Sequence, residues 1–165
     1  MDKKDLEKLL MRFSHLGVSH SKNGALLIGK APHIAEYAWL NIMYPCITEA
    51  EVCDLEKKLG VAIPEVYRDF LMNVSNGLNV MNCTLALHGC RTSYNRADFE
   101  SRYPFNIEDV QKYERPKNAT PEMFFLPLII MTAQSSILIP RIIRYTIVIA
   151  MMRRRLNHGI RYRQC

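Results

Sequence analysis

Residues 47–77 carry the start and stop signals of two consecutive short helices. Thr48, followed three residues later by Glu51, forms a capping box and marks the beginning of the first helix. Gly60 is placed to end that helix, and Pro64 suits the first position of the second. Because so few residues separate the two, the segment predicts a tight αα-hairpin.

Both helices of this hairpin have an apolar face at three-four spacing. The residues on these faces are Val52, Leu55 and Leu59 in the first helix, and Val66, Tyr67, Phe70, Leu71 and Val74 in the second. A sheet would cover them, because the stretches Val80–Leu87 and Met123–Phe125 are typical of strands. We therefore expect an α+β fold, with an antiparallel or mixed sheet packed against the hairpin and flanking helices.

The first 30 residues predict a helix and a connection that precede this domain. Residues 2–16 have leucines at helical spacing, and Gly17 follows where a helix would stop. Ala25–Ile28 is a short apolar run that suits a strand. Pro32–Met43 is interpreted as another helix, opened by its proline. Residues 2–8 alternate acidic and basic side chains where a signal peptide would be apolar, so we expect a cytoplasmic protein.

The hairpin resembles the SUKH superfamily, which takes in the fungal Smi/Knr regulators of cell-wall synthesis and many bacterial immunity proteins. The residues that carry this resemblance are Glu51, Glu56, Leu59, Gly60, Ile63, Pro64, Tyr67, Phe70, Leu71, Asn76 and Gly77. Residues 104–125 are similar to the run that leads into the family's central strand. The resemblance therefore covers residues 47–125, and the SUKH-like domain is assigned to residues 31–125.

The resemblance implies a domain that binds protein partners and has no catalytic residues. Bacterial members of the family typically neutralise a cognate toxin domain by binding it. The expected partner is therefore a protein, with no cofactor, metal or small-molecule substrate.

Residues 89–103 are rich in Arg, Tyr and Phe and allow two interpretations. They could form a mobile connection with a short helix around Asn95–Ser101. They could also form a binding loop, because Tyr and Arg are favoured as anchors at protein interfaces. The candidate partner-binding residues in this loop are Arg91, Tyr94, Arg96, Phe99 and Tyr103.

The cysteines give little support for catalysis or metal binding. Cys83 and Cys90 lie seven residues apart with His88 between them, but four ligands suitable for zinc are not found. Cys53 or Cys83 with His88 could form a nucleophile and base, but no matching motif surrounds them. We expect a protein that is not an enzyme and has no metal site.

The net charge divides sharply along the chain. Residues 1–124 hold 15 of the 22 Lys and Arg residues and all 16 acidic residues. Residues 125–165 hold seven Arg, no Lys and no acidic residue. The family would continue here with strands, an acidic Asp-Gly turn and a polar helix, so residues 126–165 are interpreted as an aberrant basic tail that leaves the domain incomplete.

Three explanations of this tail remain open. A membrane segment is possible in length, but Pro127, Pro140, Arg141 and Arg144 interrupt it. A nucleic-acid arm would use the Arg side chains for phosphate contacts, although such arms also use Lys. A changed reading frame is favoured, because a shift of one nucleotide converts Met131-Thr132 and Met151-Met152 into Asp codons. It also permits an Asp-Gly turn and alternating strands.

Overall fold

The computed structural model describes residues 2–95, 97–98, 100–114, 117–118, 120, 124 and 128–130. The helices in these ranges are α1 (Lys3–Leu10), α2 (Glu49–Leu59), α3 (Glu65–Asn73) and α4 (Ile107–Tyr113), with a 3-10 helix over Met11–Leu16. The strands are β1 (Val18–His20), β2 (Leu26–Lys30), β3 (Trp39–Met43), β4 (Leu78–Val80), β5 (Leu85–Leu87) and β6 (Leu128–Ile130). The predicted α+β class is confirmed.

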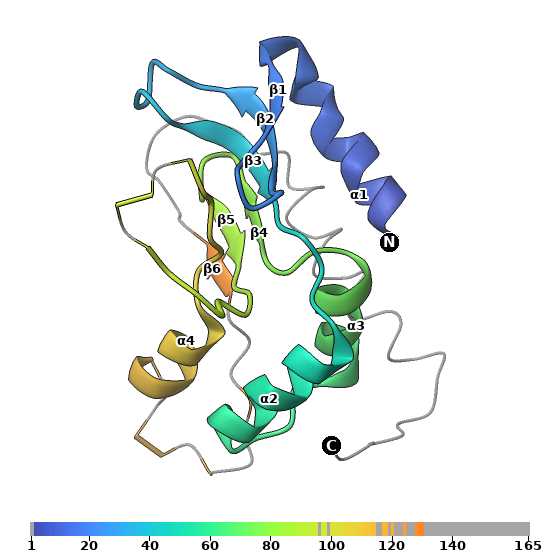
Figure 1. Ribbon diagram of the computed structural model, residues 1–165, viewed down its shortest axis with the longest axis vertical. Coiled ribbons are helices and arrows are strands. Elements are labelled where there is room, and N and C mark those ends of the chain that lie inside the picture. The colour runs from blue at the N-terminus through green and yellow to red at the C-terminus, as the bar shows by residue number, and fades with distance from the viewer. Residues whose placement is uncertain are drawn as a thin grey trace.

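The six strands form one antiparallel sheet in chain order, β1-β2-β3-β4-β5-β6. The helices α2 and α3 connect β3 to its neighbour β4, and Figure 1 shows them together at the lower end of the sheet. The helix α1 runs beside the upper part, near β1 and β2 (Figure 1). This arrangement leaves the long connection between β5 and α4 at the opposite margin from α1.

The hairpin packs against the sheet, as its apolar faces predict. One buried cluster joins the inner sides of α1, α2 and α3 to one face of the strands. Its members include Leu6, Leu10, Ile28, Met43, Val52, Leu55, Ile63, Tyr67, Phe70, Leu71, Leu78, Val80, Leu85 and Leu87. Residues 78, 80, 85 and 87 alternate along β4 and β5, so one side of these strands contributes to the cluster. A smaller cluster of Ala25, Leu27, Ile42 and Tyr44 lies apart from it.

The N-terminal predictions are confirmed in outline. Asp2 caps α1 by accepting a hydrogen bond from the backbone N–H of Asp5 at 2.8 Å. The last part of the expected helix is a 3-10 helix, a common way for a helix to end. Gly17, with φ at 113°, ends it as expected. The strand expected at Ala25–Ile28 is β2.

The helix expected over Pro32–Met43 is wrong. Residues 32–37 lie in a turn that is closed by the bond from the Ala31 N–H to the Ala38 carbonyl at 2.9 Å. Trp39–Met43 is strand β3, paired on both sides with β2 and β4. A short apolar run does not by itself distinguish a buried strand from a helix, and pairing with two neighbours decided the outcome.

The strand expected over Val80–Leu87 is two strands joined by a tight turn. Met81, Asn82 and Cys83 in this turn all have positive φ, at 50°, 51° and 65°. Three consecutive non-glycine residues with positive φ are unusual. Because the turn contains neither Gly nor Pro, the sequence carries no ordinary turn signal there. Within the predicted strand Met123–Phe125, the structure describes Phe124, whose ring lies 6.0 Å from the ring of Tyr67.

Most of the tail lies outside the described residues. Its Leu128–Ile130 segment forms β6, which pairs with β5 through Leu87↔Leu128 and Leu85↔Ile130. The reading-frame interpretation and the basic stretch at residues 131–165 fall on residues that the structure does not describe. None of the helices in the described ranges reaches the length and hydrophobicity needed to cross a bilayer.

Candidate protein-binding site

The fingerprint residues of the hairpin have structural roles at its two ends. Thr48 and Glu51 form the predicted capping box, with the Glu51 carboxylate accepting from the Thr48 N–H at 2.8 Å. Gly60 ends α2 in the left-handed conformation. Pro64 is the N-cap of α3, one position earlier than predicted, and makes no side-chain cap bond.

Glu56 connects α2 to α3. One carboxylate oxygen accepts from the Ile63 N–H at 2.7 Å, and the other accepts from Arg68 Nη1 at 2.6 Å. The two charged side chains are only 10% and 12% exposed. Arg68 also reaches the exposed Glu49 at 3.4 Å. Glu56 therefore holds the turn between α2 and α3 in place. Its bond to Arg68 is charge-assisted and shielded from water, which makes it a strong hydrogen bond.

The apolar fingerprint residues belong to the core. Ile63, Phe70 and Leu71 are buried, and Leu59 packs against them from a half-buried position. Tyr67 is buried too, and its hydroxyl donates to the carbonyl of His88 at 2.6 Å. Burial raises the pKa of the Tyr67 hydroxyl far above its ordinary value, so it stays a hydrogen-bond donor. The hairpin is thus tied to the point where the chain leaves β5.

Asn76 anchors the start of the loop that follows β5. Its side-chain N–H donates to the carbonyl of Cys90, and its side-chain oxygen accepts from the Cys90 N–H, both at 2.7 Å. The amide thus pairs with one residue of the loop as a neighbouring strand would. Gly77 and Gly89 allow this approach: a Cβ at Gly89 would lie 2.3 Å from the Asn76 carbonyl oxygen, and one at Gly77 would lie 2.9 Å from Leu87.

Asn23 anchors the far end of the same loop by the same device. Its side-chain oxygen accepts from the Arg102 N–H at 3.1 Å, and its side-chain N–H donates to the Arg102 carbonyl. The neighbouring Lys22 N–H donates to the carbonyl of Glu100 at 3.0 Å. Two asparagines, 53 positions apart in the sequence and each preceding a glycine, therefore hold residues 90–102 at both ends.

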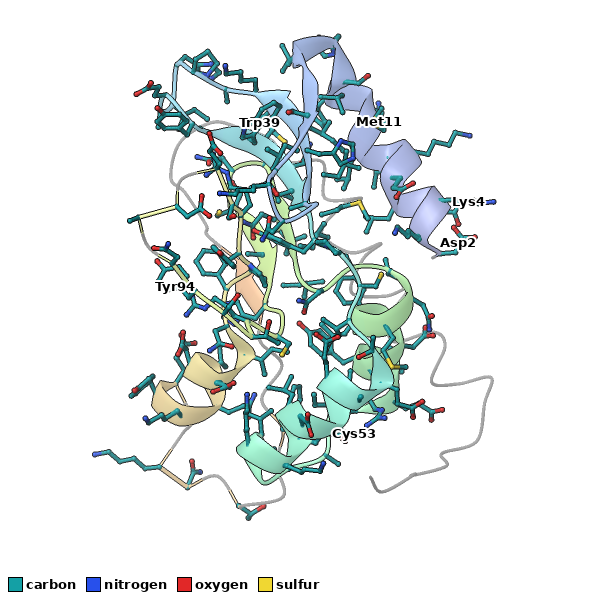
Figure 2. The ribbon with its side chains drawn as sticks, in the orientation of Figure 1. Asp2, Lys4, Met11, Trp39, Cys53 and Tyr94 are labelled. Carbon is teal, nitrogen blue, oxygen red and sulfur yellow. The ribbon has the colours of Figure 1, made fainter. Side chains whose placement is uncertain are left out.

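The anchored loop presents an Arg–Tyr cluster at the surface. Tyr94 is 57% exposed, and the Arg91 guanidinium lies 4.3 Å from the centre of its ring. The Tyr103 ring meets Tyr94 edge-on at 5.6 Å, and Arg91 reaches Asp109 of α4 at 3.4 Å. In Figure 2, Tyr94 lies at the left margin, far from Lys4 and Met11 on the α1 side. We call Arg91, Tyr94 and Tyr103 the Arg–Tyr cluster.

The structure thus brings together three of the five residues predicted to contact a partner. The other two, Arg96 and Phe99, lie outside the described residues. A short helix around residues 95–101 is not formed in the described positions there, which make turns instead. In one of them, Asp98 accepts from the Ser101 hydroxyl at 2.9 Å, a bond that lowers the pKa of the Asp98 carboxyl.

The roles of Asn23 and Asn76 are not visible in the sequence. An Asn-Gly pair in a sequence signals a turn, as at 23–24, or the end of a helix, as at 76–77. Those signals place the backbone correctly, but they do not indicate a distant partner for the amide.

The cysteines and His88 form no catalytic pair or metal centre in the part of the chain that is described. Neither ring nitrogen of His88 has a hydrogen-bond partner there. Cys83 and Cys90 carry free thiols, and burial raises the pKa of both. Within the described ranges, no group of three or more His, Cys, Asp or Glu side chains is arranged to hold a metal ion. Comparison of the chain with protein-family models, curated proteins and solved structures returns no match.

Proposed function

We propose that this chain is a non-enzymatic protein-binding domain of the SUKH type, acting in the cytoplasm as an immunity protein that neutralises a cognate toxin domain. The resemblance of residues 47–125 to that superfamily motivates the proposal. The main support for placing the binding surface on residues 90–102 is that Asn76 and Asn23 anchor the two ends of this loop.

Anchoring at both ends favours binding because it reduces the entropy that the loop loses when a partner docks. The Arg–Tyr cluster on this loop has the composition of an interface hot spot: tyrosines with few rotatable bonds and an arginine stacked on one of them. Its position beside α4 extends the surface to Asp109, which can accept hydrogen bonds from a basic partner. The partner surface should therefore offer an apolar pocket for Tyr94.

The test is co-expression with the toxin domain encoded beside this gene, followed by co-purification and titration calorimetry. Replacing both Arg91 and Tyr94 with Ala should weaken binding by about 2 kcal/mol or more, roughly 30-fold in Kd. The matched control is Tyr113→Ala, which removes an exposed tyrosine of α4 outside the loop. Equal affinity of the double variant and the wild type would move the site elsewhere, and no protection against the adjacent toxin would refute the function.

The basic tail supports one alternative, a nucleic-acid-binding protein. Seven Arg without an acidic residue in 125–165 could contact up to about seven phosphates, which gives a slope of about −6 for log affinity against log salt. Replacing Arg153, Arg154 and Arg155 with Gln should then reduce the slope by about 3. If the affinity for random DNA changes neither with salt concentration nor with these substitutions, this alternative is eliminated.

We also propose that residues 126–165 are read out of frame, so that the natural domain continues with the strands and Asp-Gly turn of the family. Resequencing the gene across the codons for residues 120–135 tests this directly. One additional base near the codons for Phe124 and Phe125 would restore the domain. An unchanged sequence would make the arginine-rich tail a real feature of the chain.

A further inference from the structure

We propose that His88 is an acid-operated latch: its neutral ring holds Phe105 and the end of the loop after β5 in place, and protonation of the ring releases them. The latch concerns the contacts that Gly89, Phe105 and Ile107 make beside His88, and it does not depend on the identity of any partner.

The backbone at His88 is held firmly while its ring is enclosed. Its carbonyl accepts from Tyr67, and the following residue, Gly89, bridges to the far end of the loop. In that bridge the Gly89 N–H donates to the Phe105 carbonyl at 2.7 Å, and the Ile107 N–H donates to the Gly89 carbonyl at 3.0 Å. The His88 side chain is only 4% exposed, so the ring cannot reach water unless something moves.

Among the described residues, no hydrogen-bond acceptor faces the ring nitrogens, so a second N–H would have no partner. A neutral imidazole has one N–H and one lone pair, whereas the protonated ring has two N–H donors and a positive charge. Both nitrogens of His88 are buried without a hydrogen-bond partner among the described residues. Adding a proton would therefore bury an unpaired charge, which is among the costliest arrangements in a protein interior.

The charged groups that act on His88 come from α4 and from its C-cap residue, Glu114. Burial lowers the pKa of His88, and the carboxylates of Glu114 and Asp109 oppose that shift. Asp109 is itself paired with Arg91, which weakens its pull on the ring. Tyr67 of α3 donates its hydroxyl to the backbone carbonyl of His88 and stays neutral, so it adds no charge. Burial is the larger effect, so the folded state keeps the ring neutral.

Phe105 is the part of the enclosure that can give way. Its ring lies 5.4 Å from the His88 ring, yet the residue is 39% exposed. Below about pH 6.5, the proton affinity of a free imidazole favours states in which the ring meets water. Phe105 does not belong to the main buried cluster, so its ring can move without removing a member of that cluster. The ratio of open to closed loop should rise by up to about tenfold for each pH unit below 6.5.

Native-state hydrogen exchange of the full chain tests the latch, read at the amides of Gly89 and Ile107. We expect both to exchange through a local opening that depends little on low urea concentrations, and their protection to fall as pH falls below 6.5. The reference is the amide of Ile47, which donates to Leu71 inside the hairpin and should open only with the whole domain. Exchange of all three amides with one free energy and one urea dependence would overturn the latch.

Two variants separate the latch from general destabilisation. His88→Leu should keep the protection of Gly89 and Ile107 independent of pH between 7.5 and 5, because the new side chain cannot bind a proton. Phe105→Ala should lower their protection already at pH 7.5 and let the His88 ring titrate near 6.5 in NMR spectra. The same acid loss of protection in His88→Leu and the wild type would refute the proposal. So would a His88 ring that titrates near 6.5 in the folded wild type.

Discussion

Removing the Glu56 carboxylate should destabilise the domain more than any other single change to a charged group of the hairpin. Glu56→Ala leaves the Ile63 N–H without its acceptor and removes the 2.6 Å partner of Arg68. Arg68 would keep its longer contact with Glu49, whose side chain is 68% exposed. The variant therefore leaves the Ile63 N–H without an acceptor and removes the shortest ion pair of Arg68, in a region shielded from water.

The magnitude follows from these two losses. An N–H left without a partner costs about 1–2 kcal/mol, and the loss of the shortest ion pair of Arg68 adds about 1–2 kcal/mol, which gives a total of about 2–4 kcal/mol. Glu56→Gln keeps an oxygen for Ile63 but offers Arg68 a neutral partner, so we expect a loss of about 1–2 kcal/mol. The order Ala worse than Gln worse than wild type is the signature of a carboxylate that joins two helices.

Urea unfolding followed by circular dichroism measures these free energies, provided that the slope m stays constant between variants. Asp54→Ala is the matched control, because Asp54 also pairs with a cation on α2, Lys57 at 3.0 Å, but both side chains are more than 65% exposed. Its effect should not exceed about 0.5 kcal/mol. If Glu56→Ala unfolds at the same urea concentration as Asp54→Ala, the reasoning about the shielded pair is wrong.

Four further outcomes follow from the geometry. Asn76→Asp should lose about 2 kcal/mol in urea unfolding, because a carboxylate cannot donate to the Cys90 carbonyl; a value near zero would contradict the anchor. Thr48→Ala should cost about 1 kcal/mol in the same assay, whereas unchanged stability would make the capping box irrelevant. Cys83→Gly should be about 1 kcal/mol more stable than Cys83→Ala, since φ at 65° suits glycine, and the reverse order would exclude backbone strain there. Burial lowers the pKa of His88 in the folded state, so the unfolded chain binds the proton first as the pH falls. The free energy of unfolding should therefore fall by up to about 1.4 kcal/mol per pH unit below 6.5. A flat profile between about pH 7 and 5, or an equal fall in His88→Leu, would oppose this.

The hairpin was predictable because its signals are local. Thr48 and Glu51 lie three residues apart and satisfy each other's backbone donors, so the start of α2 needs nothing from the rest of the chain. Gly60 ends α2 for an equally local reason, its tolerance of a left-handed backbone. The apolar spacing also indicated which side of each helix is buried, except at Val66, which is half-buried and lies outside the core cluster.

The errors arose where distant pairing competes with a short local pattern. Trp39–Met43 fits a helix by spacing, but its bonds to β2 and β4 make it the third strand of the sheet. The break between β4 and β5 was missed for a related reason. Asn82 donates its N–H to the Leu40 carbonyl at 2.7 Å, and that contact with β3 holds the turn in an unusual conformation.

The sequence by itself determined the αα-hairpin, the α+β class and the Arg- and Tyr-rich composition of the loop after β5, since these follow from neighbouring residues. Only the tertiary structure decided how that loop is held. The Asn76 and Asn23 amides find their partners 14 and 79 positions away, and His88 is enclosed by a ring from the loop's far end. Such contacts form only after the sheet has brought separate segments together, because hydrogen bonds and packing depend on distance in space and not on distance along the chain.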